Sequence, residues 1–331
     1  MRVIGCLLVG LLLLLLGCTP GQQEAQTDSV RALRLGYFAN LTHAQAIVGL
    51  ADGRLERAVG VTIKPKLFAS GPAAITALLA GEIDMLYVGP SPAVTGYMRS
   101  EGEALRIVAG AASGGAVLVM RPGADPGKLD GTRLATPGIA NTQDVALRHL
   151  VASQGLKPRE RGGSVTITAL PSAEILGLFA RGQLDGAWVA EPWGARLVQE
   201  AGGVIAIDER DLWPGGVFPT TVLVASTNYL HQHPDVVRAF VAAHVELTEW
   251  IQAHPDEARR QLQAGLAKIQ GKPIPESVLV EALGRITFLY DPMPEQVATQ
   301  AGHAFDLGYL GARRPDLRHL FDLTVLEEVT P

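Results

Sequence analysis

The chain has 331 residues, of which 47% are hydrophobic and 18% are charged. This composition is typical of a globular protein and excludes an intrinsically disordered chain, and the length suffices for two domains with their own cores. The formal net charge of −5 argues against a nucleic-acid-binding protein, which needs a basic surface.

The first seventeen residues have the pattern of an export signal. Arg2 precedes a continuous apolar run, residues 3–16, that is too short to span a bilayer comfortably and is followed by Gly17 and Cys18. A charged start, an apolar core and a small residue before a cysteine resemble a bacterial lipoprotein signal. We therefore expect cleavage after Gly17 and lipidation of Cys18, and the alternative is an ordinary signal peptide or an uncleaved anchor.

Cleavage would remove Arg2 and Cys6 and leave 27 basic and 33 acidic residues, a net charge of −6. Cys18 would then be the only cysteine, which excludes an internal disulfide and any cysteine-based metal or redox site in the mature chain. Residues 18–31 are polar and poor in apolar side chains, which predicts a flexible tether.

Strands and helices alternate with short connections after the tether. The expected elements, in chain order, are a strand at 32–37, a helix at 44–55, a strand at 59–68, a helix from 72 and a strand at 83–88. Thr42 is the expected N-cap of the first helix, because its hydroxyl can accept a free backbone N–H. The alternation predicts a mostly parallel sheet with helices on both faces, and ligands bind at the carboxyl ends of the strands of such sheets.

The same unit recurs about a hundred residues later. Residues 67–93 and 168–194 each contain an apolar helix, a Gly-x-(Ile/Leu)-Asp turn, a short apolar strand and a proline loop. The register is constant at 101 positions for three pairs: Gly81 with Gly182, Asp84 with Asp185, and Tyr87 with Trp188. We interpret the two copies as matching halves whose loops face each other across a cleft.

Two stretches are expected to connect the halves. Residues 105–120 form an apolar strand, a Gly-rich interruption and a second apolar strand, and residues 220–225 form an apolar strand that returns. The remaining chain predicts helices at 234–253, 255–269, 275–289 and 293–310 and a last short helix in the tail. We predict a discontinuous first domain, residues 32–118 and 220–331, an inserted second domain, residues 119–219, and a hinge at the two crossings.

Seven segments together resemble a known family, the solute-binding proteins of ABC importers with the type II periplasmic-binding fold. They are GYFANLTHA (36–44), SGPAAITALLAGEIDMLYVGPSPA (70–93), ASGGAVLV (112–119), TPGIANTQDVALRHL (136–150), DGAWVAEPWGARLV (185–198), LWPGGVFPTTVLV (212–224) and HPDVVRAFVAAHVE (233–246). The resemblance extends over residues 33–329 and is to the group that handles aliphatic sulfonates, taurine, nitrate and pyrimidine precursors, most of all to its aliphatic-sulfonate branch. It implies an α/β fold of two domains, each a mostly parallel sheet flanked by helices, with the ligand cleft between them.

The candidate ligand-binding residues lie in loops at the expected ligand end of each sheet. They are Asn40, Thr42, His43, Ser70, Gly71, Gly89, Pro90, Ser91, Gly114, Asn141, Thr142, Gln143, Glu191, Trp193 and Phe218. Several begin helices, where free N–H groups and the helix dipole favour an anion. Ser70, Ser91, Asn141 and Thr142 have the alternative role of helix caps, and His43 that of orienting its loop.

Other residues have alternatives that remain open. Glu191 could bind the amine of a ligand such as taurine or hold a neighbouring loop through backbone N–H groups, and we favour the loop role. Trp193, Phe38 and Phe218 could form an apolar wall or pack at a domain interface. Asp144 is expected to favour the first turn of its helix electrostatically rather than to contact the ligand.

Some patterns that suggest catalysis or metal binding have simpler structural explanations. Asp84 and Asp185 precede strands, at the end opposite the expected ligand loops, and Asp suits such turns. His231 and His233 have a spacing that a metal could use, but they precede Pro234 and are better explained as the exposed start of a helix. The sequence contains no Walker loop, catalytic Ser-His-Asp order or His-Glu-x-x-His motif.

The residues and the resemblance together predict an extracytoplasmic, lipid-anchored receptor for a small organic anion, most simply an aliphatic sulfonate. We expect it to bind by domain closure, to deliver the ligand to an ABC permease as a monomer, and to need no cofactor or metal. The alternative ligands are nitrate, taurine and a pyrimidine precursor. An enzyme is the remaining alternative, since a related fold occurs in a suicidal pyrimidine synthase; its activity depends on a Cys- and His-containing motif, and no cysteine follows Cys18.

Overall fold

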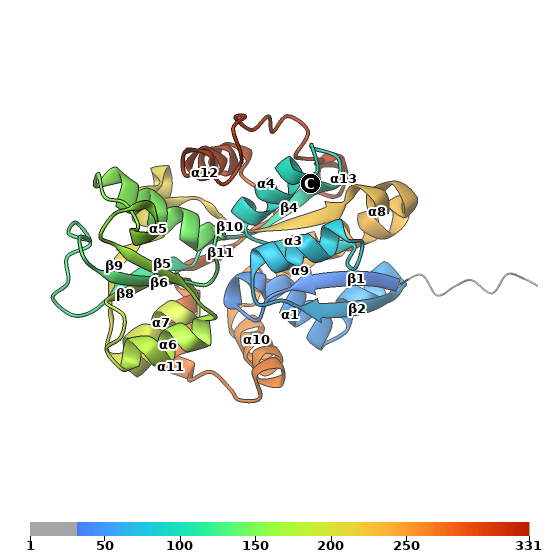
Figure 1. The fold of residues 1–331 in the computed structure, drawn as a ribbon. Coiled ribbons are helices and arrows are strands. Elements are labelled where there is room, and N and C mark those ends of the chain that lie inside the picture. The colour runs from blue at the N-terminus through green and yellow to red at the C-terminus, as the bar shows by residue number, and fades with distance from the viewer. Residues whose placement is uncertain (1–31, 331) are drawn as a thin grey trace, which may run out of the picture. The chain divides into compact units, whose positions relative to one another are not determined.

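The computed structural model describes residues 32–330, in which helices flank two separate β-sheets (Figure 1). The expected signal peptide, the lipidated Cys18 and the tether lie outside the described residues. None of the helices in residues 32–330 is both long enough and apolar enough to cross a bilayer. The expected α/β architecture with two sheets is therefore confirmed for this part of the chain.

One sheet has six strands. In order across the sheet they are β11 (Ile286–Phe288), β4 (Leu105–Gly114), β10 (Pro219–Ser226), β3 (Met85–Val88), β1 (Ala32–Tyr37) and β2 (Thr62–Leu67). β1 pairs in parallel with β2 and β3, whereas β10 runs antiparallel to β3 and β4, and β11 runs antiparallel to β4.

The other sheet has five strands and a similar plan. In order they are β7 (Thr166–Ala169), β6 (Arg133–Thr136), β8 (Gly186–Ala190), β5 (Ala116–Met120) and β9 (Val204–Asp208). β6 is parallel to β7 and β8, and β5 is antiparallel to β8 and β9. Most strands of each sheet thus run in one direction, as expected, and the exceptions are β10 and β11 in the six-stranded sheet and β5 in the five-stranded sheet.

The helices follow the predicted alternation. In chain order they are α1 (Ala44–Ala51), α2 (Arg54–Val59), α3 (Gly71–Leu79), α4 (Pro90–Arg99), α5 (Thr142–Ser153), α6 (Ser172–Ala180), α7 (Trp193–Ala201), α8 (Thr227–Gln232), α9 (Pro234–Ala253), α10 (Pro255–Gln270), α11 (Glu276–Leu283), α12 (Pro294–Asp306) and α13 (Thr324–Val329). Short 3-10 helices are η1 (Leu41–His43), η2 (Arg159–Arg161), η3 (Glu209–Leu212) and η4 (Pro214–Gly216). The single helix expected at 44–55 is wrong, since Gly53 takes a left-handed φ of 71° and separates α1 from α2.

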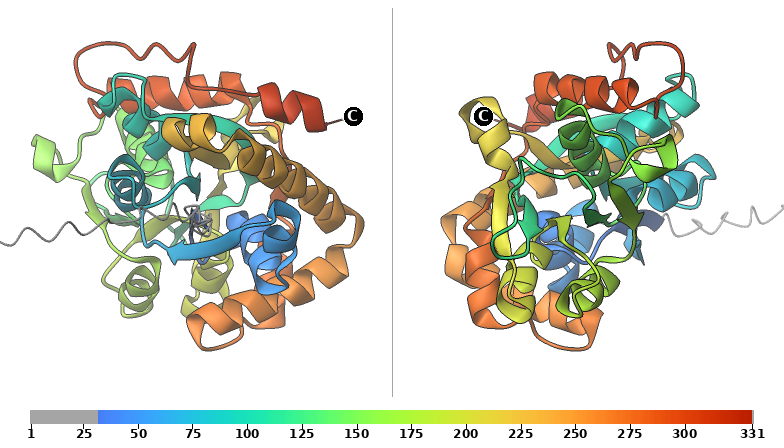
Figure 2. Two further views of the ribbon diagram at one scale, coloured as in Figure 1. Left: turned by 90° about the vertical axis from the view of Figure 1, so that its right-hand side faces the viewer. Right: turned by 60° about the vertical axis from the view of Figure 1, so that its left-hand side comes forward.

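Apolar side chains fill both faces of each sheet. Helices α1, α9 and α10 pack on one face of the six-stranded sheet, and α3, α4 and α12 pack on the other. Figure 2 shows α12 (red) and α10 (orange) on opposite sides of that sheet. In the five-stranded sheet, α6 and α7 cover one face and α5 covers the other.

Two passages connect the sheets. β4 ends in the six-stranded sheet at Gly114, and β5 begins in the five-stranded sheet at Ala116; β10 brings the chain back. Gly114 has a left-handed φ of 73°, and a Cβ on it would lie 2.4 Å from the carbonyl oxygen of Arg285, so the passage requires glycine here.

A third passage was not expected. The helix predicted at 275–289 is wrong beyond Leu283, where the chain forms the short strand β11 beside β4. Before it, α11 packs on α7, with Ser277 Oγ donating to Gln199 Oε1 at 2.7 Å and Gln199 Nε2 donating to Glu281 Oε2 at 2.6 Å. The chain therefore touches the five-stranded half and returns.

The paired acids of the internal repeat have a structural role at the starts of the strands. Asp84 Oδ2 accepts the backbone N–H of Arg34 at 2.8 Å and its Nε–H at 2.9 Å. Asp185 Oδ2 accepts the same two groups of Arg133 at 2.8 and 3.1 Å. Each arginine also donates to the carbonyl of the repeat glycine, Gly81 or Gly182. Each of these Asp–Arg pairs forms a clamp, Asp84 with Arg34 and Asp185 with Arg133. Each clamp joins two neighbouring parallel strands, away from the carboxyl ends of the strands.

We expect Asp84→Asn to lower the free energy of unfolding by about 2 kcal/mol, since a hydrogen bond to a charged group contributes ~1.5–3 kcal/mol. Asp185→Asn is the matched control. Its side chain is 29% exposed against 5% for Asp84, so we expect a smaller loss. Urea unfolding followed by circular dichroism measures both, and an equal or larger loss in Asp185→Asn would contradict the assignment.

Candidate ligand-binding site

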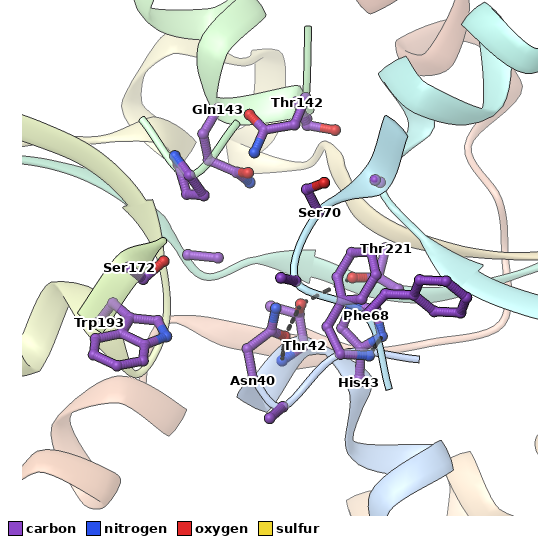
Figure 3. A pocket seen from close by; sticks show the side chains of 18 of the residues that line it. Asn40, Thr42, His43, Phe68, Ser70, Thr142, Gln143, Ser172, Trp193 and Thr221 are labelled. Carbon is purple, nitrogen blue, oxygen red and sulfur yellow. Dashed lines mark hydrogen bonds between the residues drawn. The ribbon is translucent and has the colours of Figure 1, made fainter. Parts of the chain in front are cut away.

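A cavity of about 230 Å³ opens between the two sheets, at the carboxyl ends of their parallel strands. Its wall is formed by the loops that follow β1, β2 and β3 of one sheet and β6, β7 and β8 of the other. Figure 3 shows Thr142 and Gln143 facing Asn40, Thr42 and His43 across the space. The volume is below the ~300–1,000 Å³ typical of drug-sized sites and suits a small solute.

The structure brings together ten of the fifteen residues predicted from the sequence. The ten that line the cavity are Asn40, Thr42, His43, Ser70, Gly71, Gly89, Asn141, Thr142, Gln143 and Trp193. The five that do not are Pro90, Ser91, Gly114, Glu191 and Phe218.

Four of those five residues do not reach the cavity because of how they are packed. Pro90 and Ser91 are buried in the first turn of α4, behind Gly89 and Pro92, which do reach the cavity. Gly114 lies in the passage from β4 to β5, outside the cavity. Phe218 is fully buried and stacks on Trp213, with ring centroids 5.7 Å apart.

Glu191 takes the loop role that the sequence favoured over contact with an amine. Its side chain is fully buried, Oε2 accepts the backbone N–H of Ala195 at 2.9 Å, and Oε1 accepts Arg285 Nη1 at 2.7 Å. Its backbone carbonyl also accepts the N–H of Leu41 at 3.0 Å, which ties the first cavity loop to this one. Burial raises the pKa of Glu191 despite the arginine.

Two asparagines shape the cavity as cap residues. Asn40 Oδ1 accepts the backbone N–H of Thr42 at 3.1 Å and its hydroxyl at 2.8 Å. The expected N-cap role of Thr42 is therefore wrong, and Asn40 caps η1 instead. Asn141 Oδ1 accepts the N–H of Asp144 at 2.9 Å. Since backbone N–H groups can only donate, both amide oxygens are occupied and both NH₂ groups remain as donors toward the cavity.

His43 is a neutral member of the wall. Burial lowers its pKa to about 3. The backbone N–H of Phe38 points at His43 Nδ1 at 3.3 Å, which makes that nitrogen the acceptor and leaves the proton on Nε2. The imidazole therefore offers an N–H donor without a charge.

The lining within residues 32–330 is rich in donors and contains no carboxylate, lysine or arginine. The hydroxyl donors include Ser70, whose side chain caps no helix, and Thr142, whose buried Oγ1 has no hydrogen-bond partner among the described residues. Such a lining stabilises a negative ligand through hydrogen bonds rather than through a counter-charge.

Helix N-termini add to this preference. The first residues of α3, α4, α5, α6 and α7, together with η1 before α1, reach the cavity. The first N–H groups of an α-helix have no intrahelical partner and carry the positive end of the dipole. α4 adds little to this preference, because Pro90 and Pro92 have no N–H and Ser91 does not line the cavity.

The repeat also organises the cavity. Six pairs of lining residues are 101 positions apart: Asn40 with Asn141, Thr42 with Gln143, Ser70 with Pro171, Gly71 with Ser172, Gly89 with Ala190, and Pro92 with Trp193. α3 and α6 start and end with the same offset. The two walls are therefore structurally equivalent halves, as the sequence predicted.

Comparison with known proteins agrees with this arrangement. The NMT1-like family matches residues 26–267, which is more than half of the chain. The chain belongs to the NMT1-like family. It is 29% identical to the taurine-binding periplasmic protein of Escherichia coli (strain K12) over 234 residues, which cover 69% of this chain and 70% of that protein. It is also 27% identical to the nitrate/nitrite binding protein NrtA of Nostoc sp. (strain PCC 7120 / SAG 25.82 / UTEX 2576) over 109 residues, 33% of this chain and 24% of that one.

Solved structures show the same fold. The alkanesulfonate-binding protein SsuA from Xanthomonas axonopodis pv. citri, bound to MOPS, has a TM-score of 0.70 and 20% identity and covers 86% of this chain and 95% of its own. The nitrate-binding protein NrtA from Synechocystis PCC 6803 has a TM-score of 0.72 and 17% identity, with coverages of 86% and 83%. The resemblance predicted from the sequence is confirmed, and these relatives of the NMT1-like chain are binding proteins rather than enzymes.

Sequence reasoning missed several residues of the cavity. Ser172 was recognisable, since the offset of 101 places it opposite Gly71. Thr220 and Thr221 were not, because they begin β10 and have the composition of an ordinary strand; Thr221 Oγ1 donates to Thr42 Oγ1 at 2.9 Å. Phe68 follows β2 and joins Phe38 and Trp193 in the wall.

Two further patterns lie away from the cavity. His231 lies in α8 and His233 precedes α9, where its ring lies 4.7 Å from that of Tyr229. Within residues 32–330, no three His, Cys, Asp or Glu side chains are arranged to hold a metal ion.

Proposed function

We propose that this protein is the extracytoplasmic solute-binding component of an ABC importer, and that its ligand is an aliphatic sulfonate. The observation that carries the proposal is the cavity lined by hydrogen-bond donors and helix N-termini without a carboxylate. The ligand binds between two domains, residues 32–118 with 220–331 and residues 119–219, and their closure presents it to the permease. The lipidated Cys18 anchors the monomer to the membrane.

The lining favours a sulfonate without an amine over taurine. The ammonium group of taurine would need an acidic partner to replace its hydration. Glu191, the acid among the predicted ligand-binding residues, is instead bound to Arg285 and to the backbone N–H of Ala195. The relatives that bind taurine and nitrate support a small anionic ligand. Within that class, the lack of an acidic partner for an amine favours a sulfonate without an amine.

The apolar part of the wall favours an alkyl chain over nitrate. Phe38, Phe68 and Trp193 line the cavity together with several prolines. Aromatic side chains stabilise a ligand by removing apolar surface from water, and nitrate has no such surface. The wall therefore suits a short alkyl group attached to the anionic head.

We expect the domain of residues 18–331 to be stabilised by ethanesulfonate and propanesulfonate more than by taurine or nitrate. At 100 times Kd a ligand adds about 2.7 kcal/mol to the free energy of unfolding. Thermal unfolding with each compound at equal concentration measures the order. Ethanesulfonate and taurine are a matched pair, since they differ only in the amine.

A larger stabilisation by taurine than by ethanesulfonate would overturn the ligand assignment but keep the receptor role. Stabilisation by none of these anions, together with a response to a neutral pyrimidine precursor, would overturn both the anion and the sulfonate.

A further inference from the structure

We propose that Tyr309 is a positioning residue of the ligand site, which acts through the carboxylate of Asp144 to hold the N-terminus of α5 in place. The inference rests on the proposed function, because it gives this helix end a role in holding the ligand. Asp144 directly follows three residues that line the cavity, Asn141, Thr142 and Gln143.

Asp144 is fully buried and receives hydrogen bonds from four directions. Oδ1 accepts the hydroxyl of Thr136 at 3.0 Å, and Oδ2 accepts the backbone N–H of Ala140 at 2.9 Å and the hydroxyl of Tyr309 at 2.8 Å. Arg148 Nε donates to both oxygens at 3.0 Å. The carboxylate thus joins the end of β6, the cavity loop and α5 itself.

The loop before α5 needs this support. Ala140 has a φ of 59°, a left-handed conformation that is unfavourable for a residue with a Cβ. Its N–H is fixed by Asp144 Oδ2. The conformation of Ala140 sets the direction in which the chain enters α5, and hence where Asn141 and Thr142 point.

Tyr309 reaches this network from the other half of the molecule. It follows α12, and its ring packs with the apolar cluster of the six-stranded sheet. Nearby, Arg161 Nη2 donates to the carbonyl of Leu307 at 2.6 Å. Burial and the Asp144 carboxylate both raise the pKa of Tyr309, so its hydroxyl stays protonated and donates. The contact therefore joins the two walls of the cavity.

The test is Tyr309→Phe, which removes the hydroxyl and leaves Asp144 its three other donors. We expect the dissociation rate of propanesulfonate to rise about tenfold with little change in the association rate, as for loss of a hydrogen bond to a charged group. In the ligand-free protein, we expect faster amide hydrogen exchange at residues 140–145. Stopped-flow fluorescence and mass spectrometry measure the two effects.

Tyr290→Phe is the matched control. Its ring is partly buried in the core of the six-stranded sheet, and no hydrogen bond to its hydroxyl occurs in the described residues. We expect it to change neither the dissociation rate nor the exchange at 140–145.

Unchanged exchange at 140–145 in Tyr309→Phe would overturn the proposal, and so would faster exchange with an unchanged dissociation rate. If the wild-type protein bound no sulfonate, the proposed function would fail on its own, and a wild-type exchange pattern in Tyr309→Phe would still reject the positioning role.

Discussion

We expect Gly89→Ala to lower the affinity for the proposed sulfonate ligand by about 10- to 100-fold and to leave the domain folded. A Cβ on Gly89 would lie 2.3 Å from Thr142 Oγ1 and 3.3 Å from its Cβ, on the opposite wall of the cavity. Gly89 has φ −65° and ψ 149°, which alanine adopts without strain. The added methyl group therefore obstructs the approach of the two walls rather than the fold of either, and overpacking of this kind costs ~1–3 kcal/mol.

Thr142→Ala isolates this effect. It removes the hydroxyl that the new methyl group would strike, so Gly89→Ala should cost no more than about twofold when introduced into Thr142→Ala. Isothermal titration of the four proteins gives the coupling between the positions. Equal losses in both backgrounds would show that the walls do not need to meet at this point.

The second large effect concerns stability. Arg285→Met should lower the free energy of unfolding by about 3–5 kcal/mol, because removing one partner of a buried ion pair leaves the other charge without compensation. Arg285 Nη1 lies 2.7 Å from Oε1 of Glu191, whose side chain is completely buried. Urea unfolding of the ligand-free domain measures the loss.

The loss should also depend on pH. Burial raises the pKa of Glu191 in the folded protein, and the arginine opposes this shift. Without Arg285 the pKa rises further, so the folded state holds a proton that the unfolded state, at its ordinary value of 4.5, releases. A carboxyl group whose pKa is raised in the folded state lowers the free energy of unfolding as pH increases above 4.5. The deficit of Arg285→Met should thus be larger at pH 8 than at pH 5.

Two variants control for this interpretation. Glu191→Gln combined with Arg285→Met should recover part of the stability, since no charge remains buried. Arg318→Met breaks an ion pair between Arg318 and Asp316, whose side chains are 80% and 56% exposed, and should cost far less stability than Arg285→Met. A pH-independent deficit in Arg285→Met would mean that lost packing, not the buried carboxylate, sets its size.

The internal repeat made much of the site predictable. Because strands and helices of the two halves keep one offset, residues in the loops of one half have counterparts in the other, and ten of the predicted residues do meet in one cavity. The clamps at Asp84 and Asp185 follow from the same offset. Local chemistry was less informative, since Asn40 and Thr42 are both good caps and only the folded chain decides between them.

The misses involve contacts that sequence periodicity does not encode. β11 has only three residues, too few for an alternating pattern, and it forms because β4 offers a free edge. Thr220 and Thr221 enter the cavity because β10 begins at the boundary between the sheets. The loop role of Glu191 could be favoured from the sequence, but its partner Arg285, 94 positions away in the chain, could not be identified.

The passage through α11 and β11 limits how the two halves can move. Two connections, near Gly114 and before Pro219, would allow both bending and twisting. The third, which rests on α7 and returns beside β4 through Arg285, restrains the twist. We expect an opening that keeps all three intact to be mainly a hinge motion of one half relative to the other. One distance between a probe on each half should then report this hinge opening.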